Sequence, residues 1–348
     1  INIFGNNITR EEVIRNNLLV DEGDAFNELL QKKTLNNLKS LNFFSKVDSE
    51  IIDVANENKK IINITVEEKP TGEIIAGAGV GTNGGTIAFG VSENNYLGRG
   101  IEFAADIAVS AESLKGLVSM NNPNYKGSNR SLNTSIESTV TDRIENFGYK
   151  SNKTGFSIGS GFEFYDDLYW NTGFSSYIEK LETDSTASAS MKKQVGSYFD
   201  TYFNQTFTYD KRNQKYKTTD GYISRFTQNV PLLSESYTLI NTYDYKTYNQ
   251  WLDENVFSFG FFAKTSKSLI GEDVKLSDRL YLPASKLRGF ESGKIGPKDG
   301  YDYIGGNYAA SINLATTLPQ IMPNLQNTNF SVFFDAANVW GIDYDSSL

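Results

Sequence analysis

The spacing of apolar residues changes near residue 74, and this change divides the chain into two parts. In the first part, apolar residues recur twice at helical spacing, and alternating segments lie on either side. The order strand, helix, helix, strand, strand predicts a compact α+β domain over residues 1–73, with both helices on one face of a small sheet. The predicted elements are a strand at 1–4, a helix that begins after Thr9, a helix at about 26–41, and strands at 46–54 and 60–67.

Local signals place the ends of these elements. Thr9 is followed three residues later by Glu12, which is the spacing of a capping box at a helix N-terminus. Asn56, Glu57 and Asn58 separate the last two predicted strands, and Asn favours turns because its side chain bonds to the nearby backbone. We therefore expect Thr9 to cap the first helix and residues 56–58 to form a turn.

From residue 74 onward the helical spacing disappears, and alternating apolar and polar segments follow one another, broken by Asn, Asp, Gly and Ser. Most segments are about ten residues long, which is the length that crosses a bilayer at a tilt, whereas strands of soluble proteins average about five to six residues. We predict an antiparallel transmembrane β-barrel over residues 74–348. Its thirteen predicted strands are 74–82, 85–94, 101–110, 113–120, 130–141, 152–164, 168–181, 198–209, 221–230, 236–248, 256–265, 304–317 and 328–339.

The sixth of these strands shows the two predicted faces clearly, because Phe156 and Ile158 alternate with Ser157 and Gly159. The mean hydropathy of the chain, −0.41, fits a barrel because only the outward half of each strand has to be apolar. A large soluble β-domain with cross-strand aromatic pairs is the alternative. Tyr and Trp near strand ends, such as Trp170, favour the barrel because their rings suit the boundary between membrane and water.

Composition removes several kinds of chemistry. The 348 residues include no histidine and no cysteine, so the chain has no imidazole base, no thiolate nucleophile, no disulfide and none of the usual structural zinc ligands. The net charge of −9, from 33 basic and 42 acidic residues, argues against a nucleic-acid partner, which requires a basic face. We expect no enzymatic activity, no catalytic residue, no cofactor and no metal site.

Two motifs have the letters of enzyme signatures without the surroundings that those signatures need. Gly155 to Gly159 reads Gly-Phe-Ser-Ile-Gly, but it lies in the middle of a predicted strand and has no histidine base. Gly79 to Gly84 fits a dinucleotide-binding pattern, but a strand follows it instead of a helix, so Asn83-Gly84 is interpreted as a hairpin turn. The carboxylate pairs Asp166-Asp167 and Glu67-Glu68 lie at turns or strand ends and are interpreted as solvated charge.

Six motifs lie in order along nearly the whole chain. They are Gly5-Asn6, Asp21-Glu22-Gly23-Asp24-Ala25-Phe26, Leu41-Asn42-Phe43-Phe44-Ser45-Lys46-Val47, Val66-Glu67-Glu68-Lys69-Pro70-Thr71-Gly72, Asn95-Tyr96-Leu97-Gly98-Arg99-Gly100, and Leu287-Arg288-Gly289-Phe290 continuing to Ile295-Gly296-Pro297. On these motifs the chain resembles the BamA family, the outer-membrane barrel-assembly factors of Gram-negative bacteria. The first four look like that family's last POTRA domain and its junction to the barrel. The fifth looks like its first periplasmic turn, and the sixth like the signature of its long sixth extracellular loop.

The predicted connection over residues 266–303, called the long loop below, carries the sixth motif. A connection of this length in a compact protein is either functional or disordered. If it folds into the lumen, Arg288 needs an acidic partner, because a guanidinium keeps its charge. Asp335 qualifies, since it lies on the face of its predicted strand opposite Phe334. We expect Arg288, Gly289 and Phe290 to form a latch with Asp335 that holds the loop inside the barrel.

The resemblance also implies a second acidic partner for this arginine, at the position that matches Ala315. The acid is absent here, so the latch is expected to be weaker or to use Asn313 nearby.

The first predicted barrel strand has glycines at 77, 79 and 81, all on its inward face. Because glycine has no side chain, this strand is expected to pack weakly against its neighbours. The resemblance implies that such a seam opens and that its edge templates a strand of a client by β-augmentation, without nucleotide. The alternative is that the glycines only relieve crowding in the lumen. The predicted seam residues are Ile74, Ile75, Ala76, Gly77, Ala78, Gly79, Val80 and Gly81.

The resemblance further implies partners and a location. Glu22, in the turn between the two helices, matches a family position that contacts a periplasmic lipoprotein. The expected partners are unfolded outer-membrane β-barrel clients, periplasmic lipoproteins of an assembly complex and outer-membrane lipid. The expected location is the outer membrane, with the POTRA domain in the periplasm.

Two other functions remain open. A protein-secretion or autotransporter-assembly pore of the same superfamily shares the POTRA domain and the Arg-Gly-Phe loop, although the Glu-Lys-Pro-Thr-Gly junction favours the assembly factor. A passive porin would explain the barrel alone.

The chain begins without Met, and thirteen is an odd count for a bacterial barrel. The resemblance implies about sixteen strands. We therefore expect a fragment that holds the last POTRA domain and an incomplete barrel whose C-terminal strands are missing.

Overall fold

The computed structural model describes residues 1–55, 59–81, 84–252, 255–318 and 330–344. The predicted turn at 56–58 and Asn83 of the predicted hairpin turn lie outside the described residues. The chain forms two compact units. Unit 1 comprises residues 1–77, 88–107 and 117–135, and unit 2 comprises residues 78–87, 108–116 and 136–348.

The N-terminal part of unit 1 has the predicted order of elements. In its three-stranded sheet β3 lies in the middle, parallel to β1 and antiparallel to β2. Ile14 from the first helix and Leu38 from the second are fully buried against Ile64 of β3, so both helices pack on the same face of the sheet. The elements are β1 (Asn2–Phe4), α1 (Glu11–Arg15), α2 (Glu28–Ser40), β2 (Phe44–Asp53) and β3 (Lys60–Glu68).

The predicted cap of the first helix is wrong. Arg10 occupies the N-cap position of α1, and no side chain caps the helix there. Thr9 is buried, and its hydroxyl accepts a hydrogen bond of 2.8 Å from the side-chain amide of Asn95. Because a buried amide without an acceptor is costly, this distant contact determines the role of Thr9. The sequence reading also missed Asn27, whose side chain caps α2 by accepting from the backbone N–H groups of Leu29 and Leu30.

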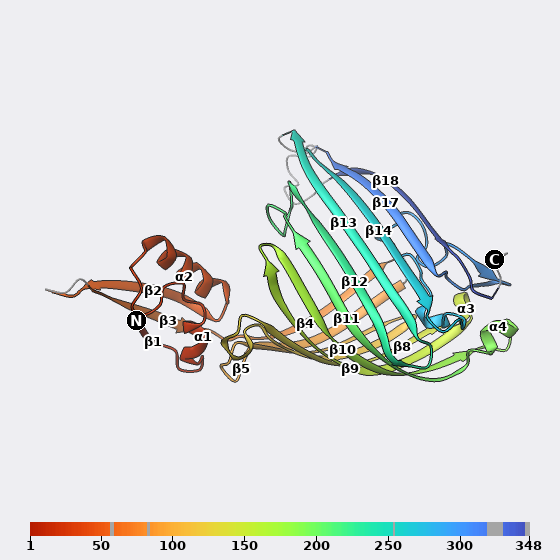
Figure 1. Ribbon diagram of the computed structural model, residues 1–348, viewed down its shortest axis with the longest axis horizontal. Helices are drawn as coiled ribbons and strands as arrows, with labels where there is room; N and C mark the ends of the chain where they lie inside the picture. Colours follow the sequence, from red (N-terminus) through yellow and green to blue (C-terminus); the bar gives the residue numbers. More distant parts are fainter. Residues whose placement is uncertain (56–58, 82–83, 253–254, 319–329, 345–348) are drawn as a thin grey trace. The chain divides into compact units, whose positions relative to one another are not determined.

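A thirteen-stranded sheet follows, as predicted, and its strands neighbour one another in chain order from β4 to β18 (Figure 1). Within the described residues β4 and β18 are the two edge strands of this sheet. The strands are β4 (Gly72–Gly81), β5 (Gly84–Tyr96), β6 (Ile101–Ser110), β7 (Ser113–Asn122), β8 (Ser131–Arg143), β9 (Tyr149–Tyr165), β10 (Leu168–Thr183), β11 (Gly196–Asp210), β12 (Gly221–Ser234), β13 (Thr238–Leu252), β14 (Asn255–Ser268), β17 (Tyr308–Thr317) and β18 (Ser331–Trp340).

Several strands are longer than predicted, with 17 residues in β9 and 16 in β10. Their extra residues carry backbone pairing beyond the apolar stretch, up to short helices that lie at one end of the sheet (Figure 1). Phe147, Leu181 and Met191 pack together at this end. The remaining short elements are α3 (Ile144–Phe147), α4 (Ala189–Lys192), two 3₁₀ turns at Tyr125–Gly127 and Leu276–Asp278, and a two-stranded ribbon of β15 (Lys298–Asp299) and β16 (Asp302–Tyr303).

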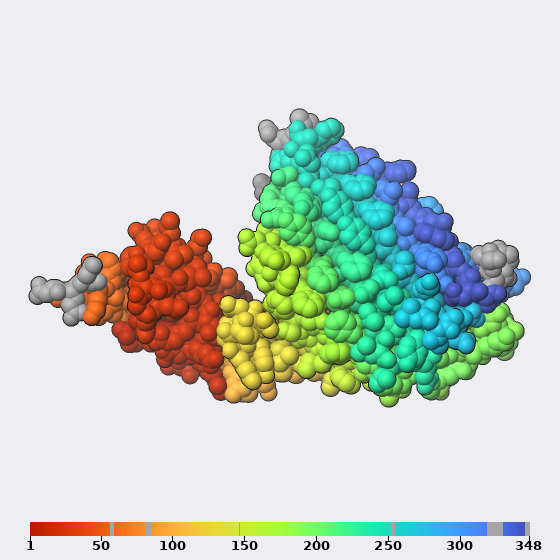
Figure 2. All heavy atoms as spheres, viewed as in Figure 1, coloured from red at the N-terminus to blue at the C-terminus, as the bar shows by residue number. Residues whose placement is uncertain are grey.

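The two predicted faces of the sheet are visible in the pairing of unit 2. Phe174 of β10 lies opposite Ile158 of β9 on one side and Phe203 of β11 on the other, and all three belong to the outward apolar face. In Figure 2 the side chains of β10 to β14 form one continuous face, coloured from green to cyan. On the opposite face the Asn204 amide donates to Ser175 Oγ at 2.8 Å. The period of two therefore separates an apolar face from a polar face, as the alternation predicts.

Among the described residues, no helix is long and apolar enough to cross a membrane.

Candidate functional site

The long loop connects β14 to β17, and in the structure it covers residues 269–307. Leu280 and Leu282 from this loop are buried in one cluster with Phe262 of β14, Ala309 of β17 and Val339 of β18. The three strand residues lie on the face opposite the outward apolar residues Phe261, Tyr308 and Trp340. The loop therefore packs against the inward face of these three strands.

The structure brings Arg288 of the long loop to Asp335 of β18. The Arg288 guanidinium donates from Nε to Asp335 Oδ2 at 2.7 Å and from Nη2 to Oδ1 at 2.6 Å, and the Arg288 backbone N–H donates to Oδ2 at 3.0 Å. Only 2% of the Asp335 side chain is exposed, against 34% for Arg288. Hydrogen bonds to Asp335 raise the pKa of the guanidinium above its ordinary value. Two parallel bonds to one carboxylate make this a directional, charge-assisted pair.

Neighbouring side chains complete the pair. The guanidinium carbon of Arg288 lies 3.8 Å from the centre of the Phe333 ring, two residues before Asp335 on the same strand face. Asn313 of β17 donates to Asp335 Oδ1 at 2.8 Å and to the carbonyl of Lys286 at 2.9 Å. Asn313 pairs directly with Asp335 in the sheet register, whereas Ala315 lies opposite Phe333. An amide at 313 thus contacts the same carboxylate, and Ala315 supplies no polar group.

The sequence reading missed two partners of this site. Phe333 could have been found from the strand period, because residues two apart share a face. Lys286 could not, since its ammonium binds Asp244 of β13, more than forty residues away in the chain. The same ammonium lies 4.7 Å from the centre of the Phe262 ring.

Gly289 and Phe290 follow Arg288 but do not share its contacts. Gly289 has a φ of +84°, a left-handed conformation that favours glycine. Phe290 is exposed over about half of its surface, at 54%. Of the four predicted latch residues, Arg288 and Asp335 make the polar contacts. Gly289 allows the backbone to turn directly after Arg288.

Strand β4 contains the predicted seam residues. Ile74 is 76% exposed and Val80 is 93% exposed, so these outward side chains have few neighbours. A Cβ added at Gly77 or Gly79 would meet no atom within 4 Å. Among the residues that the structure describes, both glycines therefore have open space where a side chain would lie. Within the described residues, β4 pairs with β5 alone and leaves its other backbone edge free.

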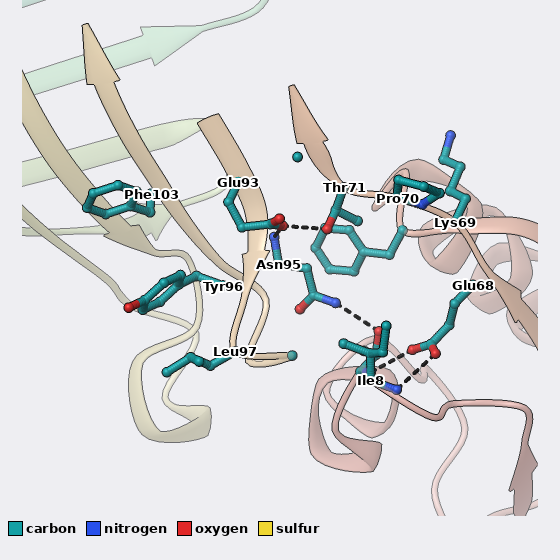
Figure 3. Close-up of a pocket in the computed structure, with 14 residues that line it drawn as sticks. Ile8, Glu68, Lys69, Pro70, Thr71, Glu93, Asn95, Tyr96, Leu97 and Phe103 are labelled. Atoms are coloured by element: carbon teal, nitrogen blue, oxygen red, sulfur yellow. Dashed lines mark hydrogen bonds between the residues drawn. The ribbon is translucent and has the colours of Figure 1, made fainter. Parts of the chain in front are cut away.

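Glu68, at the end of β3, organises the loop before α1 (Figure 3). Its carboxylate accepts hydrogen bonds from the backbone N–H groups of Asn7, Ile8 and Thr9, at 2.9, 2.9 and 2.6 Å. Burial opposes ionisation of this carboxyl, but the three donors outweigh it and lower the pKa of Glu68. The interpretation of Glu67-Glu68 as solvated charge is incomplete for Glu68, because its half-buried carboxylate also accepts three backbone N–H groups.

A chain of hydrogen bonds continues from this loop to the turn between β5 and β6. Asn95 donates to Thr9 at 2.8 Å and accepts from the Gly100 backbone N–H at 2.7 Å. Glu93 accepts from the Asn95 backbone N–H at 2.7 Å and from the hydroxyl of Thr71. In Figure 3, Glu93 points toward Thr71, and the Asn95 amide points toward the segment that carries Ile8.

The same part of unit 1 has an open cleft of about 760 Å³. Its lining is mostly apolar and includes Phe43, Pro70, Tyr96 and Phe103. The rings of Tyr96 and Phe103 stack with their centres 5.7 Å apart. The cleft thus lies beside the motif Asn95-Tyr96-Leu97-Gly98-Arg99-Gly100.

Glu22 lies in the turn between α1 and α2, with 60% of its side chain exposed. It accepts a hydrogen bond from Arg15 Nη1 at 3.1 Å. The carboxylate is therefore accessible and held in one orientation.

The motifs with enzyme-like letters lie in strands. Gly155 to Gly159 is part of β9, and no helix follows it there. Gly79 and Gly81 belong to β4, and β5 begins at Gly84. Asp167, in one of the carboxylate pairs, accepts a hydrogen bond from Lys211 Nζ at 2.6 Å at the surface. In the part of the chain that the structure describes, no group of acidic side chains could hold a metal ion.

Known proteins resemble the chain over its whole length. It is 25% identical to the outer membrane protein assembly factor BamA of Nitratidesulfovibrio vulgaris and 24% identical to that of Neorickettsia risticii. Each match covers 99% of this chain but only 44% and 47% of the relative, so the chain spans less than half of their length.

Solved structures show the same fold. The crystal structure of BamA from Haemophilus ducreyi lacking POTRA domains 1–3 matches with a TM-score of 0.81 at 22% identity, over 97% of this chain and 71% of that chain. CdiB from Acinetobacter baumannii matches with a TM-score of 0.55 at 12% identity, over 97% and 63%.

Two family descriptions match almost the entire sequence. The POTRA family, described as a surface antigen variable number repeat, matches residues 1–69. The Omp85 superfamily domain matches residues 95–347, which is well over half of the chain. The chain therefore belongs to the Omp85 superfamily.

Proposed function

We propose that the protein containing this chain folds β-barrel proteins and inserts them into the bacterial outer membrane. The observation that carries the proposal is the run of glycines at the inward positions 77, 79 and 81 of β4, which gives this strand few side chains with which to hold a neighbouring strand. A strand with so few side-chain contacts separates from a neighbour at low cost. Relatives named as assembly factors match along nearly the whole chain, which supports the same function.

Once the seam beside β4 opens, the backbone of this strand supplies the chemistry. An incoming strand that pairs with β4 satisfies its N–H and C=O groups before they meet hydrocarbon, where each unpaired group costs several kcal/mol. This step needs hydrogen-bond donors and acceptors in register, and neither a nucleotide nor a metal ion. We therefore propose that the protein is not an enzyme, with catalytic residues, cofactor and metal all absent from its mechanism.

The chain is an outer-membrane protein with its POTRA domain in the periplasm. We place the boundary between the POTRA domain and the barrel at residues 73 and 74, within the first residues of β4. The Arg288–Asp335 latch holds the long loop against the inward face of β14, β17 and β18. In this proposal the loop keeps that side of the sheet ordered while the β4 edge exchanges partners.

The proposed partners follow from the surfaces. Unfolded β-barrel clients pair with β4, and lipid contacts the outward apolar face that includes Phe174 and Phe203. A periplasmic lipoprotein binds near Glu22, whose carboxylate is exposed and oriented by Arg15. A nucleic-acid partner is not proposed, because the chain carries a net charge of −9.

A secretion or autotransporter-assembly pore of the same superfamily is the second candidate, and the fold similarity to CdiB supports only the shared fold. A passive porin is disfavoured because the long loop, tied down by Arg288, packs over the inward face.

Depletion of the full-length protein in its host separates these functions. A general loss of many outer-membrane β-barrel proteins from the membrane fraction, measured by quantitative proteomics, is the expected result. Loss of a single exported substrate, with all other outer-membrane proteins retained, would support secretion instead. Unchanged levels of all of them, with a solute-permeability defect, would support a porin.

A further inference from the structure

A second attachment of the long loop lies upstream of Arg288. Val274 and Leu276 are fully buried, and Arg279 is 3% exposed, so this segment of the loop is enclosed although it is not part of a strand. Leu276 packs in one cluster with Phe147, Leu181 and Met191. The Leu276 backbone N–H donates to the side chain of Gln194 at 2.8 Å.

Lys275 lies in the centre of this segment and pairs with two strands at once. Its ammonium is 2.7 Å from Glu179 Oε2 on β10 and 2.7 Å from Asp200 Oδ2 on β11, and 3.6 Å from Asp278 in the same loop. The exposed fractions of the Lys275, Glu179 and Asp200 side chains are only 2 to 3%. The ammonium also lies 5.0 Å from the centre of the Tyr198 ring.

Hydroxyl groups hold the two carboxylates in place. Glu179 accepts from Ser151 of β9 at 2.5 Å and from Ser277 of the loop at 3.0 Å. Asp200 accepts from the Ser234 hydroxyl at the end of β12. Residues from four consecutive strands, β9 to β12, therefore form the hydrogen-bond network around Lys275. A surface ion pair has no such network of supporting groups.

The charge balance favours the ion pair. Burial opposes the charged form of Lys275, but the carboxylates of Asp278, Glu179 and Asp200 outweigh it and raise the pKa of the ammonium. Burial also raises the pKa of Asp278, whose Oδ2 has no hydrogen-bond partner within the described residues. Lys275 thus stays charged, and an uncharged replacement would leave the carboxylates of Glu179 and Asp200 buried without a cation.

Three basic side chains attach the loop to different parts of the sheet. Lys275 is bound to β10 and β11, whereas Lys286 is bound to β13 and Arg288 to β18. Between residues 275 and 288 the chain crosses the inward side, where Leu280 and Leu282 are also buried. Fixing one end of such a segment lowers the conformational entropy that the other end must lose to reach its partner.

We propose that Lys275 is a positioning residue: by pairing with Glu179 and Asp200 it fixes the start of the long loop so that Arg288 meets Asp335. This inference rests on the proposed function, because it assigns Lys275 to the latch that serves assembly. It predicts that loss of the Lys275 charge loosens the Arg288 region as well as the segment around residue 275.

The test uses the full-length protein in lipid vesicles, with any cysteine outside residues 1–348 replaced by serine. These 348 residues contain no cysteine, so one introduced cysteine carries a single label. A nitroxide on Ser285→Cys, an exposed site between Lys275 and Arg288, reports the mobility of the loop near Arg288. Lys275→Met should make this label more mobile. It should also speed amide hydrogen exchange of residues 283–290 by at least about tenfold, as expected for loss of a charge-assisted bond.

The controls separate a positioning role from general destabilisation. Lys267→Met, at an exposed lysine near the end of β14, should change neither readout, and Lys275→Arg should restore both because it keeps the charge. If Lys275→Met does not fold, Lys275→Met/Glu179→Gln/Asp200→Asn removes the unpaired carboxylates and should show the same loosening. Wild-type mobility and exchange at residues 283–290 in a folded variant would overturn the proposal.

Insertion of a β-barrel client into the same vesicles is measured in parallel. A mobile label with undiminished insertion would keep Lys275 as the anchor and contradict the role of the latch in assembly. An immobile label with impaired insertion would overturn the positioning role and leave the assembly function standing.

Discussion

The carboxylate of Asp335 accepts three hydrogen bonds from Arg288, two from the guanidinium and one from the backbone N–H, across 47 residues of chain. Arg288→Ala removes the two side-chain donors and leaves a carboxylate that is almost fully buried beside Asn313. We expect a loss of about 1.5 to 3 kcal/mol in the stability of the folded barrel. Assembly activity should also fall. The temperature of heat-induced unfolding of the full-length protein, followed by gel mobility, measures the first effect.

Arg288→Lys should recover only part of this loss, because an ammonium cannot make two parallel bonds to one carboxylate. Arg225→Ala is the matched control, since this exposed arginine of β12 makes, among the described residues, one long hydrogen bond of 3.4 Å to Thr208. Wild-type stability and activity in both Arg288→Ala and Asp335→Ala would refute the latch.

Valine at Gly77 and Gly79 should strengthen the edge of β4. Space is available at both positions, and valine favours the strand by about 1 kcal/mol per site. We expect slower insertion of clients in a reconstituted assay with no loss of barrel stability. Gly116→Val of β7 is the control, because its added Cβ would have one neighbour, the carbonyl oxygen of Ser138 at 4.0 Å, and within the described residues β7 is not an edge strand. Equal slowing by the control would remove the special role of β4.

Gly173 is required for a close approach between two strands. A Cβ at Gly173 would lie 2.3 Å from the carbonyl oxygen of Ile158 and 2.6 Å from Cα of Gly159. Gly173→Ala should therefore destabilise the pairing of β9 with β10, whereas Gly77→Ala should not. A lower unfolding temperature of Gly173→Ala in lipid vesicles is the expected measurement, and equal tolerance of both changes would contradict the close approach.

Glu68 makes unit 1 sensitive to acid. Because the pKa of its carboxyl is lowered in the folded protein, its stabilisation is complete above the ordinary value of 4.5 and is lost as the pH falls below it, through the lowered value. Glu68→Gln should lower the free energy of unfolding by about 1.5 kcal/mol at neutral pH. It should also make the free energy of unfolding less dependent on pH below 4.5. Urea unfolding followed by a dye on Asn36→Cys, an exposed site of α2, measures both effects. An unchanged acid profile in Glu68→Gln would exclude this group as the cause.

Thr9 and Asn95 form a buried hydrogen bond that a methyl group cannot replace. Thr9→Val keeps the shape and removes the acceptor of the Asn95 amide, which should cost about 1 to 3 kcal/mol. Amide exchange of residues 93–100 should become faster in the full-length protein. Thr9→Ser retains the hydroxyl and should behave like the wild type, and faster exchange in this variant would attribute the effect to packing instead.

Glu22 is expected to bind a partner without stabilising the fold. Glu22→Lys reverses an exposed charge next to Arg15, so co-purification of periplasmic lipoproteins with the full-length protein should decrease. Glu28→Lys is the matched control, because Glu28 is equally exposed and also pairs with a neighbouring cation, Lys32. Undiminished co-purification with Glu22→Lys would exclude this carboxylate from the interface.

Much of the fold follows from periodicity. The five N-terminal elements and the thirteen strands lie within a few residues of their predicted spans, because burial of one face imposes a local repeat of 3.6 or 2 residues. The prediction that Arg288 pairs with Asp335 needed two sources. The period of two places Asp335 on the inward face, but only the resemblance to a known family indicated that Arg288 of the long loop is its partner.

Local patterns were enough to predict which residues face inward and which strands follow one another, and composition excluded the chemistry of histidine and cysteine. The partners of Thr9, Glu68 and Lys275 became known from the folded protein alone, because local patterns assigned Thr9 to a helix cap, Glu68 to solvent and Lys275 to no role. A buried polar group is satisfied by whichever partner the fold brings within about 3 Å, and distant partners leave no repeat in the sequence.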